Sequence, residues 1–401
     1  MHDQLLAKLR RVPLVRVLAR YGELGHAPEH SPIVVAVDAD EQLRVRVTPP
    51  GLAFALPARI DQVGAAVDLA ARAIDQALVE EPVPQAALEV EDLIMRARHM
   101  LHDNMRDTPR AMALLEQGVA ITPDEPRLIS NLAIAHVRMA FFLGETNTTS
   151  LARAIELAHR ALALAPQLAD SHIAAAHVAL NTGDAVEAAV QFRSAIACAP
   201  HLTEAHEHLG RLLLEAGYID VAIARLDETL RIAVGPRMVR WDIGRAWVLE
   251  GRWDEYRALE AELQAEGRDR PMSRVRYMWW QRDLSGLREF RRWFDAGGQT
   301  ALAPEAIRAM LRVFLDSDYA AVRDQMIGFI HAEKVNARRR AFVTQMAVEA
   351  AAFAGDLDTA FVALGHANDS GLFDLHWLDK CQLLAPLRAD PRFAGARAPV
   401  K

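Results

Sequence analysis

The feature that most constrains this chain is a repeat of 34 residues in its middle part. Gly183, Gly217 and Gly251 stand one period apart, and so do Pro166 and Pro200. A period of this length is typical of helical hairpins. Such hairpins stack on one another, because a single hairpin cannot bury its apolar face alone. The sequence therefore predicts an α-solenoid with an open concave groove instead of one closed globular core.

Each repeated residue type has a mechanical role in the unit 169–202. Small Ala175 lets the paired helices approach closely, and Gly183 accepts the left-handed backbone that ends the first helix. Phe192 fills the space between neighbouring repeats. The same order of small, large and Pro positions recurs in the units 203–236 and 237–270.

Over these three units the positions resemble the tetratricopeptide repeat (TPR), which implies a mainly α-helical, TPR-like solenoid of helical hairpins. Units 92–125 and 126–168 match the pattern more loosely. The second of them is nine residues too long, which predicts a lengthened first helix and a longer loop. Residues 271–374 keep the rhythm of helix pairs with fewer matching positions.

The carboxyl end at residues 383–393 resembles the closing segment of TPR arms in bacterial signalling proteins. Those proteins include serine/threonine kinases, adenylate-cyclase-like proteins and transcriptional regulators. This chain departs from them because it has no Gly-rich phosphate loop after a strand and no His-Arg-Asp or Asp-Phe-Gly motif. The resemblance implies a role in bacterial signalling without a catalytic module of its own.

The first eighty residues follow a period of two. Residues 43–47 alternate between apolar side chains and Arg, residues 33–37 and 52–56 flank them, and turn residues lie between, so the sequence predicts a three-stranded meander. A helix after Asp61 is expected to cover this sheet. The predicted organisation is a small α/β domain at 1–81, a linker at 82–91, well-formed TPR repeats at 92–270, and degenerate repeats with a C-terminal cap at 271–401.

Composition argues against several classes of partner. Forty-six Lys and Arg against fifty-three Asp and Glu give a formal net charge of −7, which offers no field for nucleic acid or an anionic membrane. The chain has no run of eighteen apolar residues, and its amino terminus lacks the pattern of an export signal. The sequence therefore predicts a cytoplasmic protein with no nucleic-acid or membrane partner.

Catalytic and metal-binding patterns are weak. On a helix, His206 and His208 diverge by about 200° and cannot chelate one ion together. His99 and His102 share a face but have no evident acidic or thiol partner. We predict no catalytic residue, no metal site and no cofactor, and hence no enzymatic activity.

The TPR resemblance places one position of each first helix along the concave groove. Arg side chains beside a Trp suit an acidic or carboxylate-bearing peptide, because guanidinium forms bidentate contacts and Trp supplies an apolar anchor. Alternatively, Arg211 pairs with Glu207 at i,i+4 and only solvates the surface. The predicted groove residues are Asn131, His177, Glu207, Arg211, Trp241 and Arg245.

These observations predict a non-enzymatic scaffold for protein–protein interactions that binds a peptide or partner domain in its concave groove. The alternative is a regulatory or sensory arm of a bacterial serine/threonine kinase or adenylate cyclase pathway that acts in trans, with a signalling kinase as partner. The corresponding positions of the chaperone-tail clamp known in TPR proteins include Arg96, Met100, Asp170 and Ala174, and only Asn131 matches outright. A chaperone-tail adaptor is therefore not expected.

Overall fold

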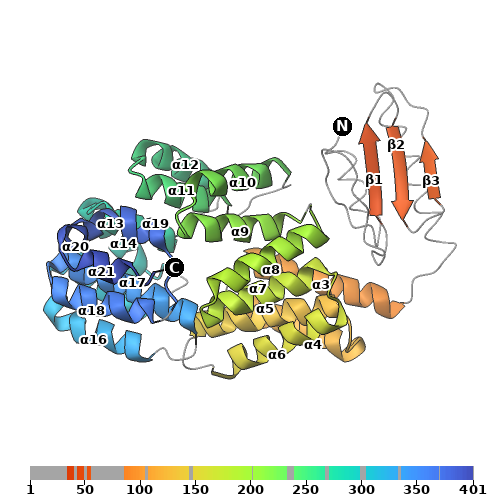
Figure 1. Cartoon of the computed structure of the whole chain (residues 1–401), viewed down its shortest axis with the longest axis horizontal. Helices are drawn as coiled ribbons and strands as arrows, with labels where there is room; N and C mark the ends of the chain where they lie inside the picture. The colour runs from red at the N-terminus through yellow and green to blue at the C-terminus, as the bar shows by residue number, and fades with distance from the viewer. Residues whose placement is uncertain are drawn as a thin grey trace.

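The computed structural model describes residues 34–39, 43–48, 52–55, 85–103, 107–143, 148–200, 202–232, 239–266, 271–298, 304–332, 336–369 and 371–400. These residues form a mainly helical array preceded by three strands (Figure 1). Within the described ranges, no helix combines the length and the apolar composition needed to cross a lipid bilayer.

The three strands form an antiparallel sheet in the order β1-β2-β3. They are β1 (Val34–Ala39), β2 (Leu43–Thr48) and β3 (Leu52–Ala55). The register pairs Val37 with Val45 and Val45 with Phe54. The helix expected after Asp61 lies outside the described residues.

Helical hairpins follow one another from residue 85 to residue 265. The pairs are α3 (Gln85–Asp103) with α4 (Thr108–Ile121), α5 (Pro126–Leu143) with α6 (Thr148–Leu164), α7 (Ala169–Thr182) with α8 (Ala185–Cys198), α9 (Thr203–Glu215) with α10 (Ile219–Ile232), and α11 (Val239–Leu249) with α12 (Trp253–Ala265). The predicted helix pairs are confirmed, since α7 and α9 begin 34 residues apart. The lengthened first helix is confirmed as well, because α5 has 18 residues and α7 has 14.

The turn between paired helices needs glycine. Gly183 ends α7 at a φ of 93°, in the left-handed region that favours glycine, and the N–H of Asp184 then bonds the carbonyl of Ala179. Close helix approach needs glycine elsewhere. A Cβ at Gly210 would lie 2.5 Å from the Leu226 side chain, so a larger residue there would force Leu226 to shift.

The linker predicted at 82–91 is wrong in its larger part. Helix α3 begins at Gln85, and the structure places most of the expected linker in its first two turns. The reason lies in the apolar spacing of Val90, Leu93 and Ile94, which are all buried. Val90 and Ile94 belong to one core cluster with residues of α4 and α5. Pro82 and Pro84 precede the first residue of α3 in the sequence, so they interrupt none of its hydrogen bonds.

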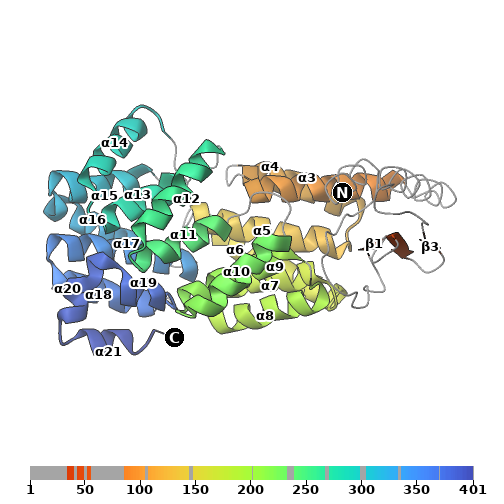
Figure 2. The same ribbon diagram turned by 90° about the horizontal axis from the view of Figure 1, so that it is seen from above.

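The second half continues the helix pairs and ends in short helices. These elements are α13 (Pro271–Trp280), α14 (Leu284–Asp295), α15 (Pro304–Asp316), α16 (Tyr319–Ala332), α17 (Ala337–Ala354), α18 (Leu357–Asn368), α19 (Leu375–Lys380), η4 (Gln382–Leu384), α20 (Ala385–Ala389) and α21 (Phe393–Arg397). Figure 2 shows α3 to α10 at one end of the molecule and α13 to α21 at the other. Large aromatic side chains fill the core of the second half, where Trp279, Trp280 and Trp377 are fully buried.

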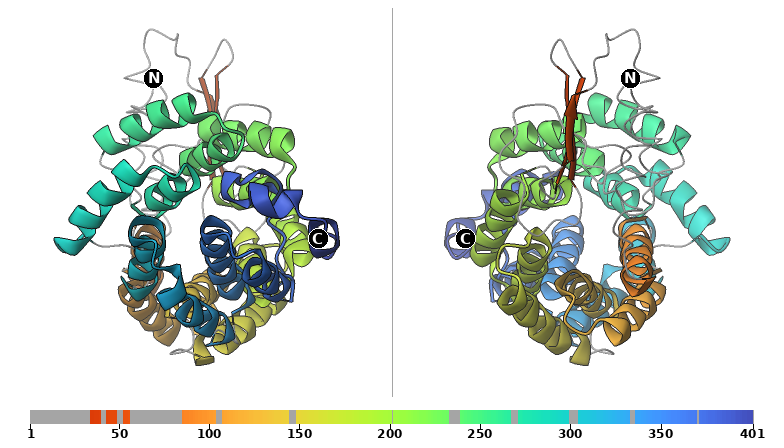
Figure 3. Two further views of the ribbon diagram at one scale, coloured as in Figure 1. Left: turned by 90° about the vertical axis from the view of Figure 1, so that its left-hand side faces the viewer. Right: turned by 90° about the vertical axis from the view of Figure 1, so that its right-hand side faces the viewer.

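The array turns back on itself. Helix α17 contacts α5 and α7, and α19 contacts α9 and α11, although these helices lie far apart in the sequence. Seen along the long axis, the helices follow one another around a ring (Figure 3). The chain therefore differs from the solenoid expected from the repeats, whose concave groove would be open along its length.

Candidate functional site

The inner side of the array is the side formed by the first helices α5, α7, α9 and α11. The C-terminal segment, residues 336–400, reaches this side through α17 and α19. Helix α17 suits such a position because its small and apolar residues surround the whole helix, and ten of its side chains are buried. The structure thus provides its own occupant for part of the predicted groove.

Polar contacts attach the start of α17 to the repeats. The amide of Asn336 donates to the side chain of Asn181 at 2.8 Å, and Arg338 binds both carboxylate oxygens of Glu215 at 2.6 Å. Arg339 donates to the backbone carbonyl of Phe141 at 2.6 Å. This end of α17 is therefore bonded to three first helices, α5, α7 and α9.

Arg211 lies in a charge network between two repeats. Its Nε donates to Asp242 Oδ2 at 2.9 Å, and its Nη2 donates to Glu207 Oε1 at 3.2 Å. The i,i+4 pair with Glu207, which the sequence left open as an alternative, is present in the structure. Asp242 comes from α11, so Arg211 also links two adjacent first helices.

Arg245 binds a carboxylate from the C-terminal segment. Its Nη2 lies 2.7 Å from Asp374 Oδ2, and the amide of Gln345 donates to the same oxygen at 3.1 Å. Burial would raise the pKa of Asp374, but the Arg245 charge and the backbone N–H of Trp377 outweigh burial and hold this pKa below its usual range. The carboxylate is therefore ionised and paired.

The remaining predicted groove residues, Asn131, Trp241 and His177, take no part in the ion pairs of Arg211 and Arg245. Asn131 is buried, and its amide donates to the backbone carbonyl of Arg127 at 2.7 Å. Trp241 is buried in the core of the second half. His177 meets the ring of Phe192 edge-on at 5.8 Å. Of the six predicted groove residues, the structure brings Glu207 and Arg211 into direct contact. The other four, Asn131, His177, Trp241 and Arg245, each contact different partners.

A cluster that the sequence analysis missed lies around His177. The potential ligand atoms of His177 on α7 and of Glu204 and His208 on α9 all lie within 4.8 Å of one another. Arg98 from α3 binds Glu204 Oε2 at 3.1 Å and Asp170 Oδ1 at 2.8 Å. The sequence signal was the i,i+4 spacing of Glu204 and His208, which places both side chains on one face of a helix. The sequence analysis considered His208 only together with His206.

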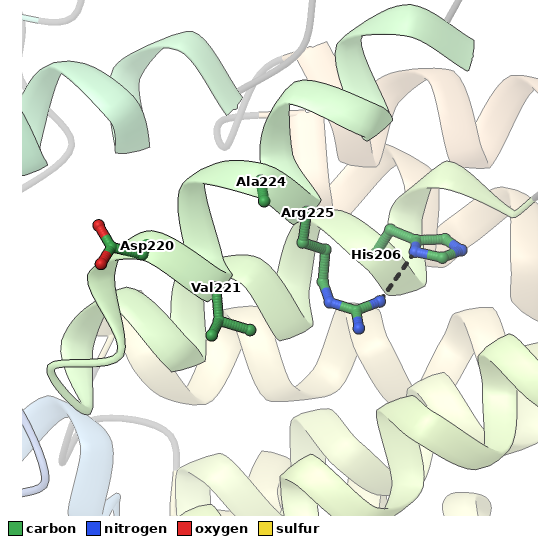
Figure 4. A pocket seen from close by; sticks show the side chains of 5 residues that line it. All are labelled: His206, Asp220, Val221, Ala224 and Arg225. Carbon is green, nitrogen blue, oxygen red and sulfur yellow. Dashed lines mark hydrogen bonds between the residues drawn. The ribbon is translucent and has the colours of Figure 1, made fainter.

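An open cavity of about 600 Å³ lies between α9 and α10 (Figure 4). Its lining residues are His206, Asp220, Val221, Ala224 and Arg225. Arg225 Nη1 lies 3.1 Å from Nδ1 of His206, and Nε2 of His206 lies 2.9 Å from the carbonyl of Pro200. Because a guanidinium only donates, Nδ1 accepts and Nε2–H donates to the carbonyl. His206 thereby fixes the turn between two repeats, as His172 does with Pro166 one repeat earlier.

The repeat geometry agrees with the sequence pattern. Helices α7 and α9 begin one sequence period apart, and the hairpins turn at Gly183, Gly217 and Gly251, each at positive φ. The hairpins thus have the geometry that the resemblance to tetratricopeptide repeats implies. They place the groove residues on the first helices α5, α7, α9 and α11, as the TPR pattern implies.

Comparisons with known proteins give structures with similar helix pairs. No protein-family model and no curated protein matches the chain. A tetratricopeptide repeat protein from Parabacteroides merdae ATCC 43184 aligns at 14% identity and a TM-score of 0.33, over 74% of this chain and 98% of that chain. Yeast Tom70 aligns at 15% identity and a TM-score of 0.38, over 79% of this chain and 68% of that chain. An O-GlcNAc transferase mutant from Thermobaculum terrenum aligns at 18% identity and a TM-score of 0.29 over 37% of this chain, which spans 27% of the transferase.

The contact between α19 and the helical repeats contains a titratable histidine. His376 is buried, and its Nε2 lies 3.1 Å from Oε1 of Glu250, the residue that follows α11, while Lys380 binds the other oxygen at 3.2 Å. Burial, and then the positive charge of Arg245, lower the pKa of His376 to about 4. His376 is therefore neutral in the folded protein at neutral pH.

We expect acid to weaken the fold through His376. Between pH 6.5 and pH 4 the unfolded chain binds a proton at this histidine and the folded chain does not, so stability falls as the pH falls. The expected loss from pH 7 to pH 5 is about 2 kcal/mol. Urea unfolding across this range measures it, with His376→Gln expected to flatten the pH slope. His172→Gln is the control, and equal slopes for the wild type and His376→Gln would contradict the assignment.

Proposed function

We propose that the protein is a non-enzymatic scaffold that binds an acidic segment of a protein partner on the inner side of its TPR array. In this proposal the partner's carboxylate replaces Asp374 on Arg245, and the other groove residues line the path that the segment follows. The single observation that supports it is the bond of 2.7 Å between Arg245 and Asp374. An Arg of the predicted groove holds a carboxylate there, and that carboxylate comes from outside the first helices.

The character of the contact with the C-terminal segment supports an exchange of occupants. Ion pairs and side-chain hydrogen bonds form part of it, including the ion pairs of Arg338 with Glu215 and of Lys380 with Glu250. Polar contacts between units of one chain resemble transient interfaces more than permanent ones. A buried ion pair also adds little net stability, because desolvation offsets much of its attraction. A partner with the same charges could therefore replace the segment at a small cost in free energy.

Affinity capture with the full chain supplies the partner, and two variants then test the proposal with purified proteins. Asp374→Asn keeps the helix cap but removes the competing charge, so we expect the partner to bind about tenfold more tightly. Arg245→Gln combined with Asp374→Asn keeps a neutral hydrogen-bonded pair. It is expected to weaken binding about 10- to 100-fold, because a charge-assisted bond to the partner is lost.

Unchanged binding by the double variant would mean that Arg245 only stabilises the fold, and the proposed groove would then be wrong. The unfolding free energy of each variant is measured alongside, so that a folding defect is not mistaken for lost recognition. A kinase or cyclase as the captured partner would favour the alternative predicted from the C-terminal resemblance, a regulatory arm acting in trans.

A further inference from the structure

We propose that His177, Glu204 and His208 bind one divalent transition-metal ion, such as Zn²⁺, between α7 and α9. The inference concerns a site separate from Arg245 and does not depend on the proposed partner. It rests on the geometry of three donors from two adjacent first helices and on the charges around them.

The donor atoms are close to the arrangement that a metal ion requires. They all lie within 4.8 Å of one another, and Nε2 of His208 lies 4.0 Å from Oε1 of Glu204. Zn²⁺ binds His nitrogen and carboxylate oxygen at about 2.0–2.2 Å, so tetrahedral ligands stand about 3.3 Å apart. Binding would require small rotations of the side chains, within their rotamers, to close this difference.

The helices and a neighbouring ring hold the donors in place. Glu204 and His208 are four residues apart on α9 and therefore share one face of that helix. The ring of Phe192 stacks on His208 at 5.4 Å and meets His177 edge-on at 5.8 Å. The two imidazole rings lie 4.4 Å apart at an angle of 82°. Such packing restricts the rotamers of both histidines, and preorganised ligands bind metal more tightly.

The surrounding charges favour a cation. Arg98 binds one oxygen of Glu204, Oε2, while the other oxygen, Oε1, lies nearest to His208. Arg98 also binds Asp170 at 2.8 Å, so one positive charge stands between two carboxylates. With neutral histidines the group carries a net charge of −1. A hydrogen bond to the carboxylate oxygen that does not face the metal is also what orients ligands in known metal sites.

The donor set selects the class of metal. Two imidazoles and one carboxylate suit Zn²⁺, Co²⁺ and Ni²⁺, whereas Mg²⁺ and Ca²⁺ prefer sets made of oxygen alone. Three protein donors leave a fourth position for water. A bound ion would join the third and fourth described hairpins directly, because α7 and α9 are their first helices.

Cobalt and zinc titrations of the full chain test the site. The titrations use protein without a polyhistidine tag, which would itself bind metal, and the protein is first treated with a chelator. We expect one equivalent of Co²⁺ to produce a visible d–d absorption band, and Zn²⁺ to displace it and raise the thermal midpoint. His208→Gln and His177→Gln are each expected to weaken Zn²⁺ binding by about 100-fold or more, since even the loss of an outer contact costs 10–100-fold.

His206→Gln is the matched control, because His206 lies on the same helix and bonds the carbonyl of Pro200. It should leave the cobalt band and the zinc affinity unchanged. Circular dichroism and the metal-free thermal midpoint of each variant separate lost binding from lost folding. The proposal is overturned if the wild type gives no cobalt band, or if His208→Gln binds Zn²⁺ as tightly as the wild type. Neither result depends on a protein partner.

Discussion

Replacing Glu349 by Ala is expected to lower the free energy of unfolding by about 3–5 kcal/mol. The Glu349 side chain is fully buried in α17, and it accepts hydrogen bonds from Arg276 at 2.7 Å, Trp279 at 2.8 Å and Trp377 at 2.7 Å. Its removal leaves the buried guanidinium without its counter-charge and two indole N–H groups without acceptors. Urea unfolding followed by Trp fluorescence measures the loss directly, since both indoles are part of the site.

Two further variants define the cause. Glu156→Ala removes an exposed carboxylate that pairs with Arg153, and it should change stability by less than about 0.5 kcal/mol. Arg276→Met combined with Glu349→Leu should recover part of the loss, because an apolar pair of similar volume replaces a buried ion pair without an orphaned charge. A loss below about 1 kcal/mol for Glu349→Ala would show that water reaches the site and that the three bonds contribute little.

Replacing Gly371 by Ala is expected to cost about 2–5 kcal/mol, from the left-handed backbone and from a collision together. Gly371 has a φ of 72°, where an L side chain is strained. A Cβ added there would also lie 2.6 Å from the carbonyl oxygen of Gly183 and 3.2 Å from its Cα. Both are backbone atoms of the α7–α8 turn, so they cannot rotate away. The C-terminal segment would have to move off that turn.

Gly355→Ala provides the matched control for this second variant. Gly355 has a φ of 81°, and no atom lies within 4 Å of an added Cβ, so only the conformational strain of about 1–2 kcal/mol applies. The difference between the two variants measures the contact between Gly371 and Gly183. Hydrogen exchange at the α7–α8 turn should accelerate in Gly371→Ala alone. Equal losses in both variants would mean that the collision is relieved at no cost.

Local rules account for what the sequence predicted well. The left-handed turn after α7 favours glycine at 183, and the close approach of Leu226 favours glycine at 210. Each requirement depends only on a helix and its immediate partner. Such requirements recur with the repeat and are visible as a period. The linker at 82–91 failed because the prolines at 82 and 84 favoured an irregular segment, whereas the burial that stabilises the start of α3 depends on α4 and α5.

The occupied inner side could not be predicted in the same way. It depends on contacts such as that of Arg245 with Asp374, which are 129 residues apart and follow from the curvature accumulated over many repeats. A weaker signal was present in α17, where small and apolar residues surround the helix instead of forming one stripe. Of the candidate sites, the i,i+4 pairs Glu207–Arg211 and Glu204–His208 were open to sequence reasoning, and the third member, His177, required the neighbouring repeat.

The return of α17 and α19 to the early repeats also shapes how the chain acquires its structure. An ordinary solenoid has only near-neighbour contacts and can begin to fold anywhere along its length. Here the bonds of Arg338 to Glu215 and of Arg339 to Phe141 join residues 123 and 198 positions apart, which raises the contact order and slows the final step. During translation, helices α5 to α11 leave the ribosome before α17 and α19 have been synthesised. The nascent protein therefore passes through a stage in which its inner side faces chaperones and partners uncovered.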